Sequence, residues 1–326
     1  MAQAGARAAH LKPAEQTPPV GTRAGAPYAP QTEERSALTW GVRARAYYEL
    51  TKPGIAIFVV MTAGVSFYVA SRGRPEVVPL VVTLLATLLA TSGALALNQW
   101  WERDPDREME RTRHRPIPSG RLTAPRALAF GVALVVAGVA LQAGMVGWLS
   151  AILLASSAAA YVLVYTPLKK RTHHAALVGG VPGAMPALIG WSAGTGGISA
   201  GGLALFAIAF FWQLPHVLAL AWMFRADYET AGFVPAPRWD REGRWIARHM
   251  IIHSAILLPV SLLPTFLYLT GFAYLIGAVF LGMLLLGAAV EARRRMDRGA
   301  ARRVFLGTLL YQPLLLGLML LDTVRV

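Results

Sequence analysis

Apolar runs recur along this chain from residue 54 to residue 322, and each approaches the roughly 20 residues that a helix needs to cross a hydrocarbon core. The runs lie at about 54–71, 77–99, 124–143, 145–166, 174–194, 202–224, 248–269, 272–291 and 303–322. Hydrophobic residues make up 55% of the 326 residues and charged residues 15%, far from the balance of a soluble domain. We therefore predict an all-α polytopic membrane protein, with nine transmembrane helices around a cytoplasm-facing cavity.

The distribution of basic residues predicts how the chain sits in the membrane. Nearly all of the 31 Lys and Arg fall in residues 1–53 and in the loops 102–126, 168–173, 225–248 and 292–303. With nine spans, these segments share one side, which the positive-inside rule makes cytoplasmic. We expect a multi-pass protein of a bacterial inner membrane, with its N-terminus in the cytoplasm and the lipid bilayer as its surroundings. This topology explains the net charge of +14, so no nucleic acid partner is needed.

The N-terminal segment differs from the rest of the chain. Residues 1–45 are rich in Ala, Pro and Gly, which predicts a disordered tail before a transmembrane domain over 46–326. The chain has no cysteine, which excludes disulfides, thiolate metal sites and cysteine nucleophiles.

Asn98, Glu102 and Asp106 follow the second apolar run at intervals of four residues. On a continued helix this spacing places three oxygen-bearing side chains along one face. Such a set suits Mg²⁺, which takes one or two carboxylates, keeps several waters and completes its shell with phosphate oxygens. Because Pro105 disfavours helix in the residue before it, we expect the helix to end near 101–104 and Asp106 to lie on a new turn.

Two further clusters lie on the same predicted side. The sequence Tyr-Thr-Pro-Leu-Lys-Lys-Arg at 165–171 closes the fourth run, although anchoring at the membrane surface would alone account for its cations. The sequence Phe-Trp-Gln-Leu-Pro-His at 211–216 places Gln213 and His216 at membrane depth, where polar groups need partners. Arg225 and Asp227 follow at the exit of that run.

Together the clusters predict a cavity with carboxylates and cations at its mouth and apolar helices below. Such a site suits an amphiphilic substrate, with a diphosphate held through Mg²⁺ and basic side chains and a hydrocarbon tail among the helices. A prenyl diphosphate has that shape.

The motifs at these positions resemble those of the UbiA-type intramembrane prenyltransferases over roughly residues 46–322. The matching motifs are Leu-Thr-Lys-Pro at 50–53, the stretch 98–106 with Met109, Arg-Thr at 111–112, Arg-Pro at 115–116, Ser-Gly-Arg at 119–121, Tyr-Thr-Pro-Leu-Lys at 165–169, Gly-Ala-Met-Pro at 183–186, Gly-Trp at 190–191, Trp-Gln-Leu-Pro-His at 212–216, Arg225, Asp-Tyr at 227–228 and Ala-Gly at 231–232. The Arg-Thr-x-x-Arg-Pro and Trp-Gln-x-Pro-His sequences are the more specific ones. They resemble the haem-directed branch, the protohaem IX farnesyltransferases or haem O synthases.

The resemblance implies transfer of farnesyl from farnesyl diphosphate to haem B, giving haem O, with Mg²⁺ as cofactor and a downstream haem A synthase as a candidate partner. By resemblance, Mg²⁺ is assigned to Asn98, Glu102, Asp106 and Asp227, the diphosphate to Arg103, Arg107, Arg111, Arg115, Lys169 and Arg225, catalysis to the metal residues with Tyr165 and Lys169, and haem to Trp212, Gln213 and His216, with His173 or His174 as alternatives to His216. Tyr165, Tyr228 and Trp212 are also candidates to face the allylic cation with their rings.

Three departures from the family pattern bear on the metal site. Glu102 stands where the family usually has Asp, and Pro105 takes the place of an ordinary apolar residue, which affects the direction of Asp106. The second acidic motif is reduced to Asp227, with no aspartate four positions away on the same predicted helix.

Two other functions also fit parts of the pattern. A prenyltransferase acting on an aromatic acid or a quinone precursor would share the diphosphate half of the site. A transporter would also have paired acidic motifs and helices interrupted by Gly and Pro, but its charges are expected near the midplane and not at one face.

Overall fold

The computed structural model describes residues 39–325, so most of the predicted tail 1–45 lies outside the described residues. The helices are α1 (Trp40–Leu50), α2 (Pro53–Ala70), α3 (Val77–Trp101), α4 (Arg103–Glu108), α5 (Ala124–Met145), α6 (Trp148–Ala159), the π-helix η2 (Ala160–Tyr165), α7 (Thr166–Leu168), α8 (Ala175–Thr195), α9 (Ala200–Met223), α10 (Arg225–Thr230), α11 (Arg244–Phe266), α12 (Phe272–Arg295) and α13 (Arg298–Leu321). Among these residues the β-structure is limited to one isolated bridge between Thr270 and Thr323.

Helix α1 begins at Trp40, inside the segment predicted as tail. Its inner face is fixed by Ala46 and Leu50, which are fully buried in a small apolar cluster with residues of α3 and of the segment before α5. Tyr47 also packs against Phe130 of α5, with ring centroids 4.8 Å apart. The ordered helical part of the chain therefore starts before residue 46.

The nine predicted spans are confirmed over the described residues: nine helices are long and apolar enough to cross a membrane, with α6, η2 and α7 forming one of them. The largest differences from prediction are at α11, which begins at Arg244 and ends at Phe266, and at α12 and α13, which continue into the charged segments 292–295 and 298–302. Hydropathy predicts the part of a helix that contacts lipid, whereas backbone hydrogen bonds can continue the helix past the end of that part. The chain is a multi-pass membrane protein.

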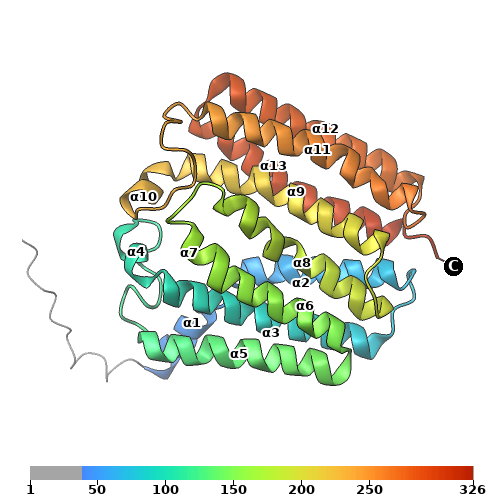
Figure 1. The fold of residues 1–326 in the computed structure, drawn as a ribbon, viewed down its shortest axis with the longest axis horizontal. Coiled ribbons are helices and arrows are strands. Elements are labelled where there is room, and N and C mark those ends of the chain that lie inside the picture. Colours follow the sequence, from blue (N-terminus) through green and yellow to red (C-terminus); the bar gives the residue numbers. More distant parts are fainter. Residues whose placement is uncertain (1–38, 326) are drawn as a thin grey trace, which may run out of the picture. The chain divides into compact units, whose positions relative to one another are not determined.

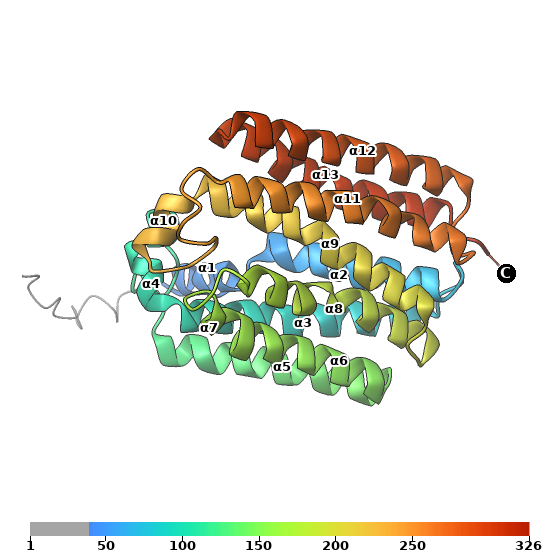
Figure 2. The same ribbon diagram turned by 45° about the horizontal axis from the view of Figure 1, so that its top comes forward.

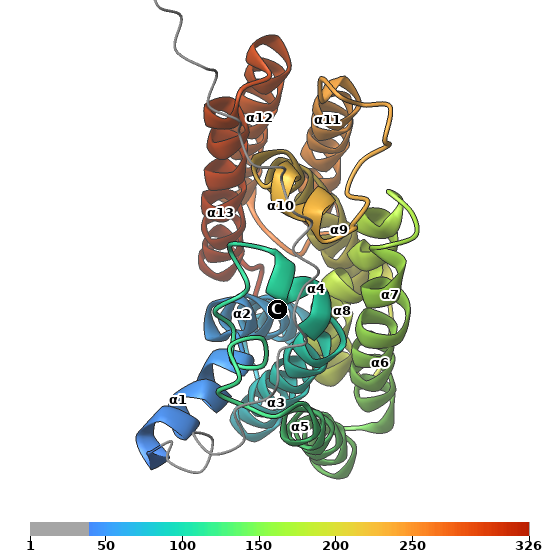
Figure 3. The ribbon, with the colours of Figure 1, turned by 90° about the vertical axis from the view of Figure 1, so that its left-hand side faces the viewer.

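The long helices run side by side, and the short helices α1, α4, α7 and α10 lie at one end of them (Figure 1). Successive helices are neighbours in the order α2, α3, α5, α6, α8, α9, α11, α12 and α13, and α13 returns to α2 and α9. Helix α8 lies against α2, α6 and α9, which places it inside the bundle (Figure 2). Viewed toward the end that carries the short helices, α4 and α10 lie near each other over the bundle (Figure 3).

Glycines allow α8 to approach its neighbours closely. The sequence predicts either close packing or a broken helix around residues 179–186, and α8 is continuous although Pro182 and Pro186 lie inside it. A Cβ added to Gly183 would lie 2.1 Å from Oε1 of Gln213 in α9, and a Cβ added to Gly190, further along α8, would lie 1.9 Å from the carbonyl oxygen of Ala63 in α2. Of the two alternatives, the structure shows close packing of α8 against its neighbours, which is usual where small residues lie between membrane helices.

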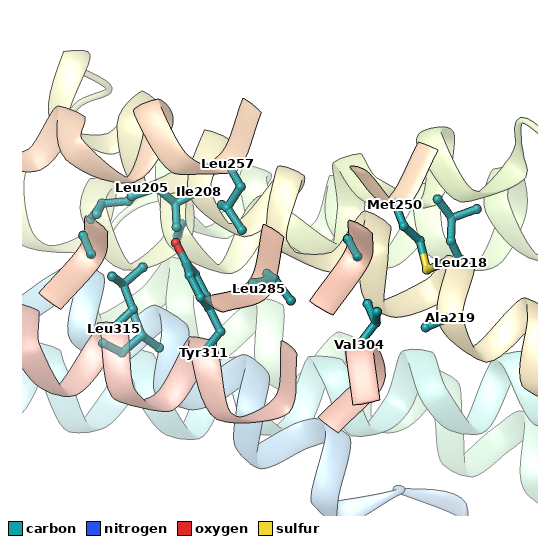
Figure 4. Packing of buried hydrophobic residues seen from close by; sticks show 14 of the residues in the cluster. Leu205, Ile208, Leu218, Ala219, Met250, Leu257, Leu285, Val304, Tyr311 and Leu315 are labelled. Atoms are coloured by element: carbon teal, nitrogen blue, oxygen red, sulfur yellow. The ribbon is translucent and has the colours of Figure 1, made fainter. Parts of the chain in front are cut away.

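The largest apolar core lies between α9, α11, α12 and α13 (Figure 4). It includes Leu257, Leu285 and Leu315, each at most 3% exposed. Tyr311 is buried among them, and its hydroxyl lies 2.6 Å from the Ser261 hydroxyl, which satisfies both polar groups. This half of the bundle therefore has a closely packed apolar interior.

Candidate active site

Asn98, Glu102 and Asp106 lie at consecutive helical turns across the junction of α3 and α4. The Glu102 amide donates to the Asn98 carbonyl at 2.9 Å, and the Asp106 amide donates to the Glu102 carbonyl at 2.8 Å. Helix α3 ends at Trp101 and Asp106 lies on α4, as predicted from Pro105, which occupies the first turn where its missing N–H is tolerated. The three side chains are 1%, 6% and 0% exposed respectively, so this is a buried polar face.

Both carboxylates of this face are paired with cations from other segments. The Lys169 ammonium, which follows α7, lies 2.7 Å from Glu102 Oε1. One Arg115 nitrogen, Nη1, lies 2.8 Å and 2.7 Å from the two carboxylate oxygens of Asp106. Burial disfavours the charged form of Lys169, but the Glu102 carboxylate, with smaller contributions from Tyr165 and Tyr161, raises the pKa of Lys169 above its usual value. The pairs join segments far apart in sequence.

Asn98 is held from two sides. The Lys52 ammonium donates to Asn98 Oδ1 at 3.2 Å, and Asn98 Nδ2 donates to the Thr166 hydroxyl at 3.1 Å. Lys52 precedes α2 in a left-handed backbone conformation with φ of 45°. Burial, and then the Arg115 guanidinium, lower the pKa of Lys52 to about 7. This lysine therefore changes charge near neutral pH.

The π-helix η2 positions Thr166 for this contact. The Thr166 hydroxyl donates to the carbonyl of Tyr161, five residues earlier, at 2.8 Å and accepts from Asn98. A π-turn adds one residue per turn, which changes the direction of the side chains that follow it, and such turns are frequent at functional sites. The ring of Tyr165, the last residue of η2, lies 4.7 Å from the Lys169 ammonium. Tyr165 and Lys169 are thus neighbours, and their catalytic roles stay predictions.

Two cavities border these residues. The first, of about 310 Å³, is lined by Glu49, Lys52, Gln99, Arg111, His114, Arg115 and Pro116. The second, of about 80 Å³, is lined by Tyr165, Lys169, His173, Ala175, Ala176, Val217, Ala221, Tyr228, Phe233, Val234 and Pro235. Three cations therefore each contact an oxygen of α3, α4 or the residue between them and also line a cavity: Lys52, Arg115 and Lys169.

Arg103, Arg107 and Arg225, predicted to contact the diphosphate, have other partners. Arg103 and Arg107 lie 3.8 Å and 3.5 Å from the exposed carboxylate of Asp104. Arg225 pairs with Glu229 at 2.7 Å and donates to backbone carbonyls of the segment that precedes α11. Arg103 and Arg107 are close to Glu102 and Asp106 in sequence, but their nearest carboxylate is the exposed Asp104 and not the buried face.

Asp227 lies on α10, half-buried, and is not joined to Glu102 and Asp106. No group of three or more His, Asp or Glu side chains suited to a metal ion occurs within residues 39–325. A metal on the buried face would therefore use two carboxylates and the Asn98 carboxamide, and the metal role of Asp227 stays a prediction. Arg111 approaches α10 more closely, with its guanidinium 5.0 Å and 5.8 Å from the rings of Phe224 and Tyr228.

The three residues predicted to bind the acceptor make contacts between helices. Trp212 Nε1 donates to the Thr308 carbonyl at 2.7 Å, and His216 Nδ1 lies 2.9 Å from the Thr308 hydroxyl. Gln213 points the other way, and its Nε2 donates to the Gly180 carbonyl at 2.8 Å. The polar groups that stood out at membrane depth thus have partners on α13 and α8, which is the usual requirement for such groups. The haem role of these three residues stays a prediction.

The sequence is similar to known proteins over most of its length. A model described as the UbiA prenyltransferase family matches residues 58–312. This chain belongs to that family. It is 44% identical over 291 residues to the protohaem IX farnesyltransferase of Solibacter usitatus, covering 85% of this chain and 98% of that protein. It is 42% identical over 280 residues to the protein of the same name from Myxococcus xanthus, covering 84% and 93%.

Solved structures of the UbiA family share the fold. A digeranylgeranylglyceryl phosphate synthase matches with a TM-score of 0.70 at 16% identity, over 86% of this chain and 98% of that one. A UbiA homologue from Archaeoglobus fulgidus bound to GPP and Mg²⁺ matches with a TM-score of 0.60 at 16% identity, over 84% and 99%. The all-α membrane fold predicted from the sequence is thus confirmed.

Two residues in contact with the buried polar face, Lys52 and Thr166, were not among the predicted site residues. Lys52 belongs to the matching Leu-Thr-Lys-Pro motif, and the signal available was a cation directly before a proline that starts an apolar run. Thr166 offered no such signal, because its contact depends on the π-helix before it.

Proposed function

We propose that this chain transfers the farnesyl group of farnesyl diphosphate to a vinyl group of haem B and, with addition of water, forms haem O. The observation that carries the proposal is the 44% identity, over 98% of its length, to a protein named protohaem IX farnesyltransferase. The buried polar face above an apolar bundle supports it, because the donor has a charged head and a long hydrocarbon tail. The allylic C–O bond breaks and releases diphosphate, and a C–C bond forms to the terminal vinyl carbon. Water then adds to the cation left on the inner vinyl carbon and loses a proton, which gives the hydroxyl group.

The buried face fits Mg²⁺ in its donor set. Asn98 Oδ1 and the carboxylates of Glu102 and Asp106 are hard oxygen donors at successive turns, and two carboxylates with waters and substrate phosphates make an ordinary magnesium shell. These three residues would hold the ion, and when bound it would neutralise charge that develops on the leaving diphosphate. A solved homologue bound to GPP and Mg²⁺ supports this assignment.

Lys52, Lys169 and Arg115 occupy the oxygens that such an ion needs. With diphosphate in the adjacent cavity, these cations would turn from their present partners to the phosphate oxygens. Each would then stabilise the charge that develops as the C–O bond breaks, as positioned cations do in phosphate chemistry. Arg111 lines the same cavity as Lys52 and Arg115 and adds a fourth cation.

The apolar helices below the cluster protect the allylic cation from water. Tyr165 lies at the boundary, 4.7 Å from Lys169, where its ring can face a cation on the reacting carbon. Exclusion of water until the vinyl group has reacted prevents capture of the farnesyl cation as an alcohol. The charged end would face the cytoplasm of a bacterial inner membrane, and the product would pass to a haem A synthase.

The test is turnover by the purified full-length protein in lipid nanodiscs. We expect haem O, identified by mass and chromatography, from haem B and farnesyl diphosphate with Mg²⁺, and none when Mg²⁺ is chelated. Replacing haem B with an aromatic acid or a quinone precursor should give no prenylated product. Prenylation of those acceptors and not of haem would assign the chain to another branch of the family, and absence of diphosphate release would leave a transporter as the better account.

A further inference from the structure

We propose that the acceptor haem binds in the hollow beneath residues 232–238, with the His173 imidazole on the iron and Arg238 on a propionate. The proposal rests on the proposed function and specifies its acceptor subsite. It places haem between α9, α11 and the segments 169–175 and 231–238, away from Trp212 and His216.

The hollow consists of two adjoining cavities. One, of about 300 Å³, and the 80 Å³ cavity beside Lys169 share Ala221, Phe233, Val234 and Pro235 as lining residues. These four shared residues are apolar and would lie against the face of a porphyrin. A volume of this size lies at the lower end for ligand sites, so it admits the reacting edge of the macrocycle and leaves the propionate edge at the rim.

His173 is the histidine that borders this hollow. It is half-buried, and within the described chain neither of its ring nitrogens has a hydrogen-bond partner. Its ring is held instead by aromatic contacts, at 4.0 Å from the ring of His174 and edge-on to Trp245 at 5.3 Å. Burial, and then the neighbouring histidines, lower the pKa of His173, which favours the neutral imidazole that binds iron.

The other histidines of α9 and α11 are less available to a ligand in this hollow, and the buried His253 has its Nδ1 2.7 Å from the His249 carbonyl oxygen. His216 has its Nδ1 on the Thr308 hydroxyl and is packed against Phe305 at 4.8 Å. The His249 ring is tilted by 31° to the Trp245 ring, with centroids 3.9 Å apart, and the same Trp245 ring also contacts His173. His173 is therefore the histidine that the walls leave facing the hollow.

Arginine stands at the rim of the same hollow. Arg238 lines it, is exposed and makes no ion pair within residues 39–325. Arg225 also lines it, but its guanidinium is used by Glu229 at 2.7 Å and by the Asp240 carbonyl at 2.6 Å. Arg225 thus holds the segment around Asp240 in place, while Arg238 is available for a carboxylate of the ligand.

The position of the hollow also suits the reaction. Tyr165 and Lys169 line the smaller cavity, and Lys169 is 2.7 Å from Glu102 of the buried polar face. A vinyl group on the inner edge of the porphyrin would therefore meet the allylic carbon of a diphosphate held by that face. The iron would lie toward His173 and the propionates toward Arg238.

The experiment is a titration of the full-length protein in nanodiscs with haem B, followed by the Soret band. We expect His173→Ala to lose the Soret shift of the wild type and to raise the KM for haem, while the KM for farnesyl diphosphate stays unchanged. His174→Ala and His216→Ala should keep the shift. An unchanged shift and KM in His173→Ala, or loss of the shift in either of the other two variants instead, would overturn the assignment.

Arg238→Gln provides a second, independent arm, with Arg241→Gln as the matched control on the same segment. We expect Arg238→Gln to weaken haem B by about tenfold, as loss of one charged hydrogen bond implies, and to leave haem dimethyl ester unaffected. Equal effects on both porphyrins, or equal effects of the two variants, would exclude the propionate contact. Absence of haem O from the wild type is a different result, because it rejects the proposed function and not the geometry of the hollow.

Discussion

Asp106→Asn separates a structural ion pair from a metal ligand. Asp106 is fully buried and holds Arg115, which is 22% exposed, through both carboxylate oxygens. Removing one partner of a buried pair costs about 3–5 kcal/mol, but Asn keeps one acceptor oxygen and Arg115 retains some solvent. We therefore expect a loss of stability of about 2 kcal/mol, seen as a lower midpoint of unfolding in detergent.

The metal role adds a second effect that stability does not explain. Asn replaces one of two anionic ligands by a neutral oxygen, so the Mg²⁺ concentration for half-maximal turnover should rise by about tenfold or more. Asp322→Asn is the matched control: it makes the same chemical change at the other end of the bundle, where Asp322 accepts from the Tyr274 amide at 2.7 Å. An unchanged Mg²⁺ dependence in Asp106→Asn, with only the stability loss shared with the control, would refute a metal role for Asp106.

Three further predictions follow from single contacts. Because the pKa of Lys52 is about 7, its charge is present below that pH and lost above it, so kcat/KM for farnesyl diphosphate should fall as pH rises through about 7. Lys52→Arg should abolish this fall. If the fall persists in Lys52→Arg, Lys52 is not the group that titrates. Thr166→Val leaves the buried Asn98 amide without an acceptor and should lower kcat/KM by about tenfold, whereas Thr166→Ser keeps the hydroxyl and should not; equal rates would exclude the contact. Gly190→Ala places a Cβ against the α2 backbone and should lower the free energy of unfolding by about 1–3 kcal/mol, measured by thermal unfolding. Gly144→Ala, which has open space around its Cβ, should not lower it. Equal unfolding midpoints of the two variants would show that α8 and α2 are not in close contact.

The membrane fold could be predicted because its main determinant is local. Runs of apolar residues near the length of a bilayer define the spans, and the interval of four residues between Asn98, Glu102 and Asp106 is enough to predict that they share a helix face. The structure confirms the nine helices among the described residues and the break near Trp101. The helix ends were less predictable, because lipid contact and helical hydrogen bonding end at different residues.

The partners of the polar residues could not be predicted, because they depend on packing between distant segments. Lys52 and Asn98 are 46 residues apart in sequence, and Lys169 and Glu102 are 67 apart. The same limit applies to His216, whose position at membrane depth suggested a ligand but whose ring has a neighbour on α13. Sequence identifies which side chains need a partner at membrane depth, and only packing decides which partner each has.

We propose that the cations now paired with Asn98, Glu102 and Asp106 transfer to the diphosphate when Mg²⁺ binds to the oxygens of these residues. This transfer is tested most directly by calorimetric affinities for farnesyl diphosphate, measured with and without Mg²⁺, in the wild type and in Glu102→Gln. The wild type should bind more tightly with Mg²⁺, whereas Glu102→Gln, which frees Lys169 from its 2.7 Å contact, should bind more tightly than the wild type without Mg²⁺ and gain little when the ion is added. A full Mg²⁺ effect in Glu102→Gln, with no gain in its absence, would contradict the account.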